Sequence, residues 1–357
     1  MKAPSLGFQV GIAGASSLLG QELVRVLDER AFPVSRLLTF EAEEEEPDLP
    51  VLDLSGGLET QPAVTGESAA ELDFLFLADR PRASSGLSPL LSPVLEAARA
   101  SAPGRPGRCG VIDMADALGE SAGPTPAAIS RIPFLERAAP NAQPSPHARL
   151  FTSMHPAAIA LSALVTRLAA RLPLKSIVAQ IFSPVSEMGS RAIDELQKQT
   201  TSLLSFQPVP QKMFGAQLAF NLLPHLGGKR DSEFAARERL ISSQVRNYLA
   251  GRFPVPALKV TQVPVFYSLA LSVYVETAGA VAPEAAEAAL AGERLRVRRR
   301  GEPAPSPVGA AGSGDILVDH ITPDAGYPQG FWIWATVDNV RLAAENAVEI
   351  AQYLSKR

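Results

Sequence analysis

Hydrophobic positions in the first 150 residues alternate between short apolar runs and segments with helical spacing. Phe8–Ala13 is typical of a buried strand, and a helix follows it with Leu23, Val24 and Leu27 on one face. Strands alternating with helical crossovers predict a Rossmann-type, doubly wound parallel sheet in residues 1–150. The further elements expected there are strands at Arg36–Phe40, Leu72–Leu77 and Gly110–Asp113, and a helix at Val94–Ala100.

Longer elements follow from about residue 150. Helices are expected at Ala157–Leu172, Ser190–Leu204 and Glu233–Leu249, and strands at Ser176–Phe182, Leu258–Val265, Ser268–Glu276 and Phe331–Val337. This mixture predicts an α+β domain on a largely antiparallel sheet in residues 151–337. The last helix, Val340–Leu354, has apolar residues at helical spacing. We expect the segment 338–357 to pack back on the first domain.

Composition narrows the class of protein. The 357 residues suffice for two domains, and 46% hydrophobic with 20% charged residues is typical of a globular protein. A net charge of −4 gives no reason to expect nucleic acid or an anionic membrane as partner. No apolar stretch approaches the roughly 18 residues that a membrane span needs, and no signal sequence is apparent, so a cytoplasmic protein is expected. One cysteine and four scattered histidines predict no metal site.

A glycine-containing turn between the first strand and helix is a candidate dinucleotide site. Its backbone N–H groups and the helix N-terminus can hold a pyrophosphate, although Ser17 stands where a glycine is usual. Glu41 follows the second strand, where a carboxylate can accept hydrogen bonds from a ribose, and it opens an acidic run that would repel a 2′-phosphate. Binding of NAD is therefore expected to meet less charge repulsion than binding of NADP. The alternative is that the acidic run is a solvated loop without a role in binding. The candidate cofactor-binding residues are Gly14, Ser16, Ser17, Leu18, Leu19 and Glu41.

The segment Val10–Val34 resembles the start of bacterial aspartate-semialdehyde dehydrogenases. The likeness continues in order through Val111–Asp113, Asp194–Thr200, Gln217–His225, Val263–Tyr267 and Trp334–Arg341. It implies a Rossmann domain followed by a catalytic and dimerisation domain, with the last helix returning to the first. It also implies a homodimer that interconverts aspartyl 4-phosphate and aspartate 4-semialdehyde with NADP. In that reaction a cysteine attacks, a glutamine positions the intermediate, an arginine binds the substrate carboxylate and a histidine moves the proton.

The matching positions of this chain carry none of those side chains. The cysteine position falls on Pro156 and the glutamine position on Ser183, while the arginine and histidine positions fall on Gln262 and Leu269. Proline suits the first turn of a helix but cannot attack a carbonyl carbon. A Glu-Glu-x-Lys helix segment of the family corresponds to Arg237–Leu240, which reverses one charge and removes another. The resemblance thus implies a family member without the family's reaction.

Other groups near these positions leave alternatives open. Hydroxyls are present at Ser153, Ser183 and Ser186, a histidine at His155, a carboxylate at Glu187 and a guanidinium at Arg191. Cys109 lies in an apolar run that predicts a buried, inert thiol on a strand. We therefore predict a homodimeric pseudoenzyme that binds NAD or NADP. The alternatives are an active NAD(P)-dependent semialdehyde dehydrogenase with a remodelled site, and an interaction protein with a heteromeric partner enzyme. Core or dimer contacts are expected from Trp332, Trp334, Phe220 and the segment Val263–Tyr267, with core favoured for each aromatic.

Overall fold

The computed structural model describes residues 7–40, 58–61, 72–79, 109–117, 128–137, 149–226 and 231–356. Contacts divide the chain into two compact units, one of Met1–Met154 with Ala343–Arg357 and one of His155–Leu342. The predicted helix Val94–Ala100 lies outside the described residues. So do Glu41 and the acidic run that it opens.

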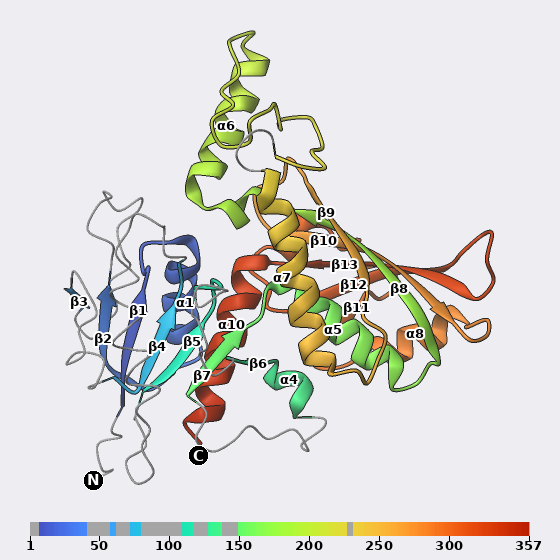
Figure 1. The fold of residues 1–357 in the computed structure, drawn as a ribbon, viewed down its shortest axis with the longest axis horizontal. Helices are drawn as coiled ribbons and strands as arrows, with labels where there is room; N and C mark the ends of the chain where they lie inside the picture. The colour runs from blue at the N-terminus through green and yellow to red at the C-terminus, as the bar shows by residue number, and fades with distance from the viewer. Residues whose placement is uncertain are drawn as a thin grey trace. The chain divides into compact units, whose positions relative to one another are not determined.

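Among its described residues, the first unit is built on a seven-stranded sheet in the order β3-β2-β1-β4-β5-β7-β6, and every pair of neighbouring strands is parallel (Figure 1). The predicted Rossmann-type parallel sheet is therefore confirmed. Its strands are β1 (Phe8–Ala13), β2 (Val34–Phe40), β3 (Leu58–Gln61), β4 (Phe74–Leu77), β5 (Gly110–Asp113), β6 (Ile129–Arg131) and β7 (Leu150–Ser153). A short helix, α4 (Pro133–Glu136), follows β6.

Two long helices share one core with this sheet. Helix α1 (Leu18–Glu29) contributes Leu23 and Leu27, and α10 (Asn339–Leu354) contributes Ala347 and Ala351 to the same buried cluster as Val10. The small side chains of α10 let its backbone approach the strands closely. The end of the chain thus completes the hydrophobic core of the first unit (Figure 1).

The second unit is built on a six-stranded sheet in the order β11-β12-β13-β10-β8-β9. Its three central pairs are antiparallel, whereas the outer pairs β11–β12 and β8–β9 are parallel, so the sheet is mixed. The strands are β8 (Leu174–Ser183), β9 (Ala257–Gln262), β10 (Leu269–Thr277), β11 (Leu295–Val297), β12 (Ile316–Pro323) and β13 (Gly330–Val337). The helices are α5 (Pro156–Ala169), α6 (Ser190–Leu204), α7 (Asp231–Leu249), α8 (Pro283–Leu290) and α9 (Pro307–Ala310), with a 3-10 turn η2 (Val185–Met188).

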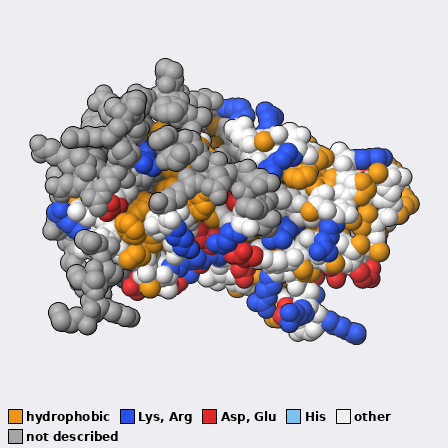
Figure 2. All heavy atoms as spheres, turned by 90° about the horizontal axis from the view of Figure 1, so that it is seen from below, with side chains coloured by type: hydrophobic (Ala, Val, Ile, Leu, Met, Phe, Trp, Pro, Cys, Tyr) orange, Lys and Arg blue, Asp and Glu red, His pale blue; other side chains and the backbone are white. Residues whose placement is uncertain are grey.

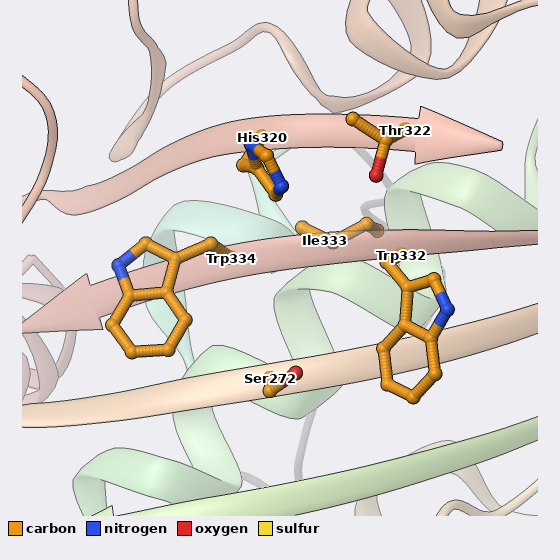
Figure 3. A pocket seen from close by; sticks show the side chains of 6 residues that line it. All are labelled: Ser272, His320, Thr322, Trp332, Ile333 and Trp334. Atoms are coloured by element: carbon orange, nitrogen blue, oxygen red, sulfur yellow. The ribbon is translucent and has the colours of Figure 1, made fainter. Parts of the chain in front are cut away.

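The central strands of this sheet bury one face and leave the other accessible. Along β10 the side chains alternate between buried and half-buried, as expected for a sheet covered on one side. On the accessible face, the indole rings of Trp332 and Trp334 lie on either side of Ser272 and line a hollow of about 270 Å³ (Figure 3). His320 also lines it, from a bulged stretch of β12 where its φ is +52°.

The preference for core positions is wrong for most of the singled-out aromatics. Phe220 is 70% exposed and Trp332 40% exposed, and Phe266 and Tyr267 of the Val263–Tyr267 segment are also exposed, while Trp334 is half-buried. The predicted strand reaching Val265 ends at Gln262, so the residues beyond it lie in a loop. Trp332 and Trp334 are two apart on β13 and therefore share its accessible face.

On the side that Figure 2 displays, the Lys and Arg side chains of the described residues are interspersed with Asp, Glu and neutral groups. Within the described residues, no helix is long and apolar enough to cross a membrane. The same residues contain no group of three or more His, Cys, Asp or Glu placed to hold a metal ion.

Candidate functional site

The start of α5 carries the position that the resemblance assigns to the catalytic cysteine. Pro156 occupies the first helical position and is buried, and its missing N–H leaves no helical hydrogen bond unmade there. His155 caps the helix, because its Nδ1 accepts the N–H of Ala157 at 3.2 Å. Gln244 of α7 accepts the backbone N–H of His155 at 2.7 Å. This helix start is thus held by a histidine cap and a proline, and it presents no thiol.

Ser183 and Gln262 end two neighbouring parallel strands and lie opposite each other in register. Both side chains are fully buried. The Gln262 amide donates to the Ser183 carbonyl at 2.8 Å, and the Gln262 backbone exchanges two hydrogen bonds with Leu223. Gln262 therefore acts as a brace between β8, β9 and the loop that contains Leu223.

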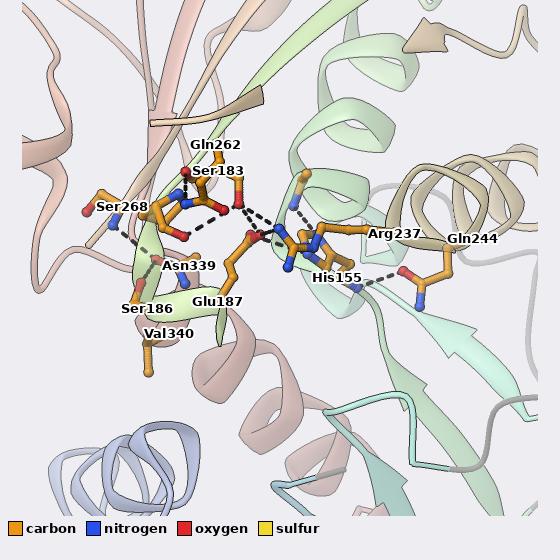
Figure 4. A network of polar contacts seen from close by, with 12 residues as sticks. His155, Ser183, Ser186, Glu187, Arg237, Gln244, Gln262, Ser268, Asn339 and Val340 are labelled. Atoms are coloured by element: carbon orange, nitrogen blue, oxygen red, sulfur yellow. Dashed lines mark hydrogen bonds and ion pairs between the residues drawn. The ribbon is translucent and has the colours of Figure 1, made fainter. Parts of the chain in front are cut away.

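A compact ion cluster forms around the Glu187 carboxylate of η2 (Figure 4). The Ser183 hydroxyl donates to Oε2 at 2.6 Å, and Nη1 of Arg237 lies 3.2 Å from the same oxygen and donates to the Ser183 hydroxyl at 2.9 Å. Nε2 of His155 lies 3.3 Å from Oε1. Arg237 comes from α7, where its guanidinium also lies over the ring of Phe234 at 5.4 Å. Four elements thus converge on one buried carboxylate.

The protonation states follow from these contacts. Burial opposes the charged form of Glu187, but attraction to His155 and Arg237, with a hydrogen bond from Ser183, lowers its pKa to about 2. Nδ1 of His155 accepts the Ala157 N–H and Nε2 faces Glu187, so both ring nitrogens are already engaged. A carboxylate of such low pKa is also a weak base toward the Ser183 hydroxyl.

Leu269 and the remaining predicted side chains serve other contacts. Leu269 begins β10 and is fully buried, so it is a core residue outside the ion cluster. Next to it, the Ser268 N–H donates to Oδ1 of Asn339, which also accepts the Ser186 hydroxyl. In the first unit, Ser153 donates its hydroxyl to the Ala343 carbonyl and accepts from Asn346. Arg191 is exposed on α6 and is not a member of the cluster.

The dinucleotide turn has well-defined backbone geometry in the first unit. Gly14 has φ +79°, and a Cβ there would lie 2.5 Å from Cβ of Asp79, so a side chain is excluded. The Ser17 hydroxyl caps α1 by accepting the Gly20 N–H at 3.0 Å, and it lies 2.8 Å from the Gly14 carbonyl. The Ser17 side chain therefore turns onto the backbone of its own loop.

Two donors remain at this helix start. Among the described residues, the backbone N–H groups of Leu18 and Leu19 have no acceptor. The side-chain amide of Gln21 donates to the Ser16 carbonyl. Unused N–H groups in the first turn of a helix are suited to bind an anion.

Cys109 lies directly before β5 rather than within it and is half-buried. Burial, with a smaller contribution from the charge of Asp73 and an opposing one from Arg149, raises its pKa to about 12. A thiol with such a pKa stays protonated near neutral pH and is a poor nucleophile.

The ion cluster is the part that sequence reasoning missed. His155 and Glu187 were candidates taken separately, and Arg237 was noted only as a reversed charge. The signal that could have connected them is the reversed charge at Arg237, where the family has a glutamate. An arginine in that place indicates that a carboxylate such as Glu187 balances its charge. Nothing in the sequence spacing relates the three elements that carry them.

The two sheets define a two-domain α/β protein whose first unit is of Rossmann type. Residues 165–342 match the model of the semialdehyde dehydrogenase dimerisation domain. The USG-1 protein homolog of Pseudomonas aeruginosa is 30% identical over 353 residues, which cover 97% of both chains. The aspartate-semialdehyde dehydrogenase of Aquifex aeolicus is 24% identical over 98% of this chain and 99% of its own. The chain therefore belongs to the aspartate-semialdehyde dehydrogenase-like family.

Solved structures agree on the fold. The aspartate semialdehyde dehydrogenase II of Vibrio cholerae, complexed with ASA, has a TM-score of 0.79 at 23% identity and covers 99% of both chains. The aspartate semialdehyde dehydrogenase of Candida albicans, solved with NADP, has a TM-score of 0.65 at 12% identity and covers 98% of both chains. These likenesses establish the architecture and leave the chemistry to the residues of the site.

Proposed function

We propose that the chain is a pseudoenzyme of this family, a dinucleotide-binding homodimer that does not interconvert aspartyl 4-phosphate and aspartate 4-semialdehyde. The observation that carries the proposal is Pro156, buried at the first position of α5 where the resemblance assigns the nucleophile. A proline nitrogen within a peptide bond has no lone pair for attack on a carbonyl carbon. Acyl transfer through a thioester therefore has no starting point at this position.

The other three roles are vacant for separate physical reasons. The Ser183 hydroxyl donates a hydrogen bond to the Glu187 carboxylate. Because that carboxylate has a pKa of about 2, it is too weak a base to activate the hydroxyl as a nucleophile. Gln262 uses its amide N–H on the Ser183 carbonyl and carries no charge for a substrate carboxylate. Leu269 is a fully buried hydrocarbon and cannot transfer a proton. Cys109, with a pKa of about 12, does not supply a replacement thiolate.

Retained dinucleotide binding is supported by the turn before α1. The N–H groups of Leu18 and Leu19, with Gly14 keeping the turn free of a side chain, fit a pyrophosphate. The bound group would supply a hydride acceptor or donor, and this chain would contribute its binding and orientation. The acidic run from Glu41 favours NAD on charge. The structure of the Candida albicans relative contains NADP, which makes the choice between the two an experimental question.

A homodimer is supported by the accessible face of the second sheet, which lies within the matched dimerisation domain. Trp332 and Trp334 expose indole surface there beside Tyr274 and Val178, with ring contacts of 5.2 Å between Tyr274 and Trp332. Exposed aromatic groups of this kind are typical of protein interfaces. Sedimentation analysis should give a dimer for the wild type and monomer for a Trp332→Glu, Trp334→Glu variant.

Two measurements test the proposed function. Purified protein should give no phosphate-dependent formation of reduced nicotinamide from aspartate 4-semialdehyde, with a relative that has the cysteine as positive control. Calorimetry should give saturable binding of NAD or NADP. Turnover would instead support the active enzyme with a remodelled site. Failure of NAD, NADP and their reduced forms to bind would remove the cofactor from the proposal.

A further inference from the structure

The Glu187 side chain connects the two positions that the resemblance assigns to the nucleophile and to the glutamine. Glu187 reaches His155, which precedes Pro156, through Oε1 at 3.3 Å. It reaches Ser183, at the glutamine position, through Oε2 at 2.6 Å. Figure 4 shows Ser183 on one side of the Glu187 carboxylate, with Arg237 and His155 together on the other. A carboxylate of the chain itself therefore lies against both His155, the residue before Pro156, and Ser183.

Three side chains lie against the Glu187 carboxylate, although its Oε1 accepts no hydrogen bond from the described residues. The Ser183 hydroxyl donates a charge-assisted hydrogen bond to Oε2, and the Arg237 guanidinium and the His155 ring lie at ion-pair distance, an arrangement that favours an anion. The side chains of Glu187, Arg237 and His155 are 7%, 13% and 15% exposed. With so little exposure, attraction between the charges is screened weakly by solvent.

The backbone of η2 holds Glu187 in this place. The N–H groups of Val185 and Ser186 donate to the carbonyls of Val265 and Phe266 at 2.9 and 3.0 Å. The Ser186 hydroxyl is also bonded to Asn339. Because both residues before Glu187 are anchored, the carboxylate is a fixed part of the folded unit.

We propose that Glu187 is a built-in ligand, and that Arg237, Ser183 and His155 form a carboxylate site which the chain fills itself. In the wild type the site excludes free carboxylates, and shortening Glu187 converts it into a receptor for a small monocarboxylate. This deepens the proposed function by naming what fills the vacated site. Its test measures the binding of acetate and depends on neither turnover nor a dinucleotide.

Acetate is the matched probe, because Glu187→Ala deletes a CH₂ and a carboxylate, which are the heavy atoms of acetate. The folded Glu187→Ala protein should bind acetate saturably by calorimetry. Its Tm should rise with sodium acetate relative to sodium chloride at equal ionic strength near pH 7. Wild type should show the same Tm in both salts, because its site is already filled.

Two controls separate charge recognition from simple cavity filling. Acetamide has the shape of acetate without its charge, and Glu187→Ala with Arg237→Met retains the cavity without the guanidinium. Each should weaken binding at least tenfold. Equal responses of Glu187→Ala to acetate and chloride, or undiminished acetate binding in the double variant, would overturn the proposal.

The proposal can still be tested if the Glu187→Ala variant does not fold on its own. If it is unfolded in chloride, acetate should restore its cooperative thermal transition, and Glu187→Ser, which removes less, should show the same preference for acetate. Absence of any acetate effect in both variants would refute the built-in ligand. Nucleotide binding and turnover of the wild type would stand as measured, so the two proposals fail separately.

Discussion

Two helix starts, one in each unit, differ in how their free N–H groups are used. At the start of α1, Ser17 caps the Gly20 N–H and, among the described residues, Leu18 and Leu19 keep N–H groups without an acceptor. At the start of α5, Pro156 removes one donor and His155 takes up the next. Among the described residues, the first start keeps two donors available to an anion, and we call it the open site. The second keeps one, the N–H of Ala158, but the ion cluster beside it is filled by the chain's own Glu187, and we call it the closed site.

Under the proposed function, this difference confines the loss of the family's chemistry to the second unit. The elements that carry the second site are intact, with strands in register and α5 buried along most of its length. Its polar groups bind one another, and Glu187 with Arg237 supplies the charge balance that a ligand would otherwise bring. In the proposed pseudoenzyme, the family's fold is kept while an internal ion cluster occupies the second site.

The largest effect is expected from removing the cation of the closed site. Arg237→Met leaves the Glu187 carboxylate buried without its guanidinium, which should lower the free energy of unfolding by about 3–5 kcal/mol. Chemical denaturation measures this, with Arg246→Met on the exposed side of the same helix as the control. Adding Glu187→Gln should recover part of the loss. Additive effects of the two substitutions would show that the residues do not interact.

The second largest effect is expected from acid, which should lower the stability that the closed site contributes to the fold. The folded pKa of Glu187 is about 2 against an ordinary value of 4.5, so its stabilisation is fully present above 4.5 and is lost as pH falls toward 2. The difference of about 2.5 in pKa corresponds to about 3 kcal/mol. Denaturation curves between pH 7 and acid should show this loss in the wild type and less of it in Glu187→Gln. Parallel curves would contradict the lowered pKa.

The open site should respond more mildly. Ser17→Ala removes the cap of α1 and should lower the free energy of unfolding by about 1 kcal/mol. Because the Ser17 hydroxyl bonds its own loop, nucleotide affinity should change only a few-fold. A complete loss of binding in Ser17→Ala would mean that the hydroxyl contacts the ligand directly.

Sequence periodicity predicted the elements best where burial follows one clear pattern. Helix α6 begins and ends at the predicted residues, and the alternation along β10 gives its strand within one residue at each end. Strand β12 was not predicted, because its bulge at His320 interrupts the alternation. The exposed aromatics were misjudged, because hydrophobicity alone does not distinguish a core from an uncovered sheet face.

The candidate site was only half accessible from the sequence. Ordered resemblance located Pro156 and Ser183, since both lie between the matched segments Val111–Asp113 and Asp194–Thr200, where the family's nucleophile and glutamine motifs are expected. The Glu187–Arg237 pair depends on how η2 and α7 approach each other, and no local propensity encodes that approach. Long-range side-chain pairing is therefore the information that only the fold supplies.

Restoring the thiol should have the smallest effect on activity. Pro156→Cys should fold with a free energy of unfolding within about 1 kcal/mol of wild type, since the first helical turn tolerates most residues. It should still give no phosphate-dependent turnover of aspartate 4-semialdehyde, because Glu187 fills the adjacent space and Ser183, Gln262 and Leu269 cannot replace the other three roles. Ala157→Cys places a thiol one residue later as the control. Turnover in Pro156→Cys above that of Ala157→Cys would show that the second site is open after all, and that the missing nucleophile alone separates this chain from its active relatives.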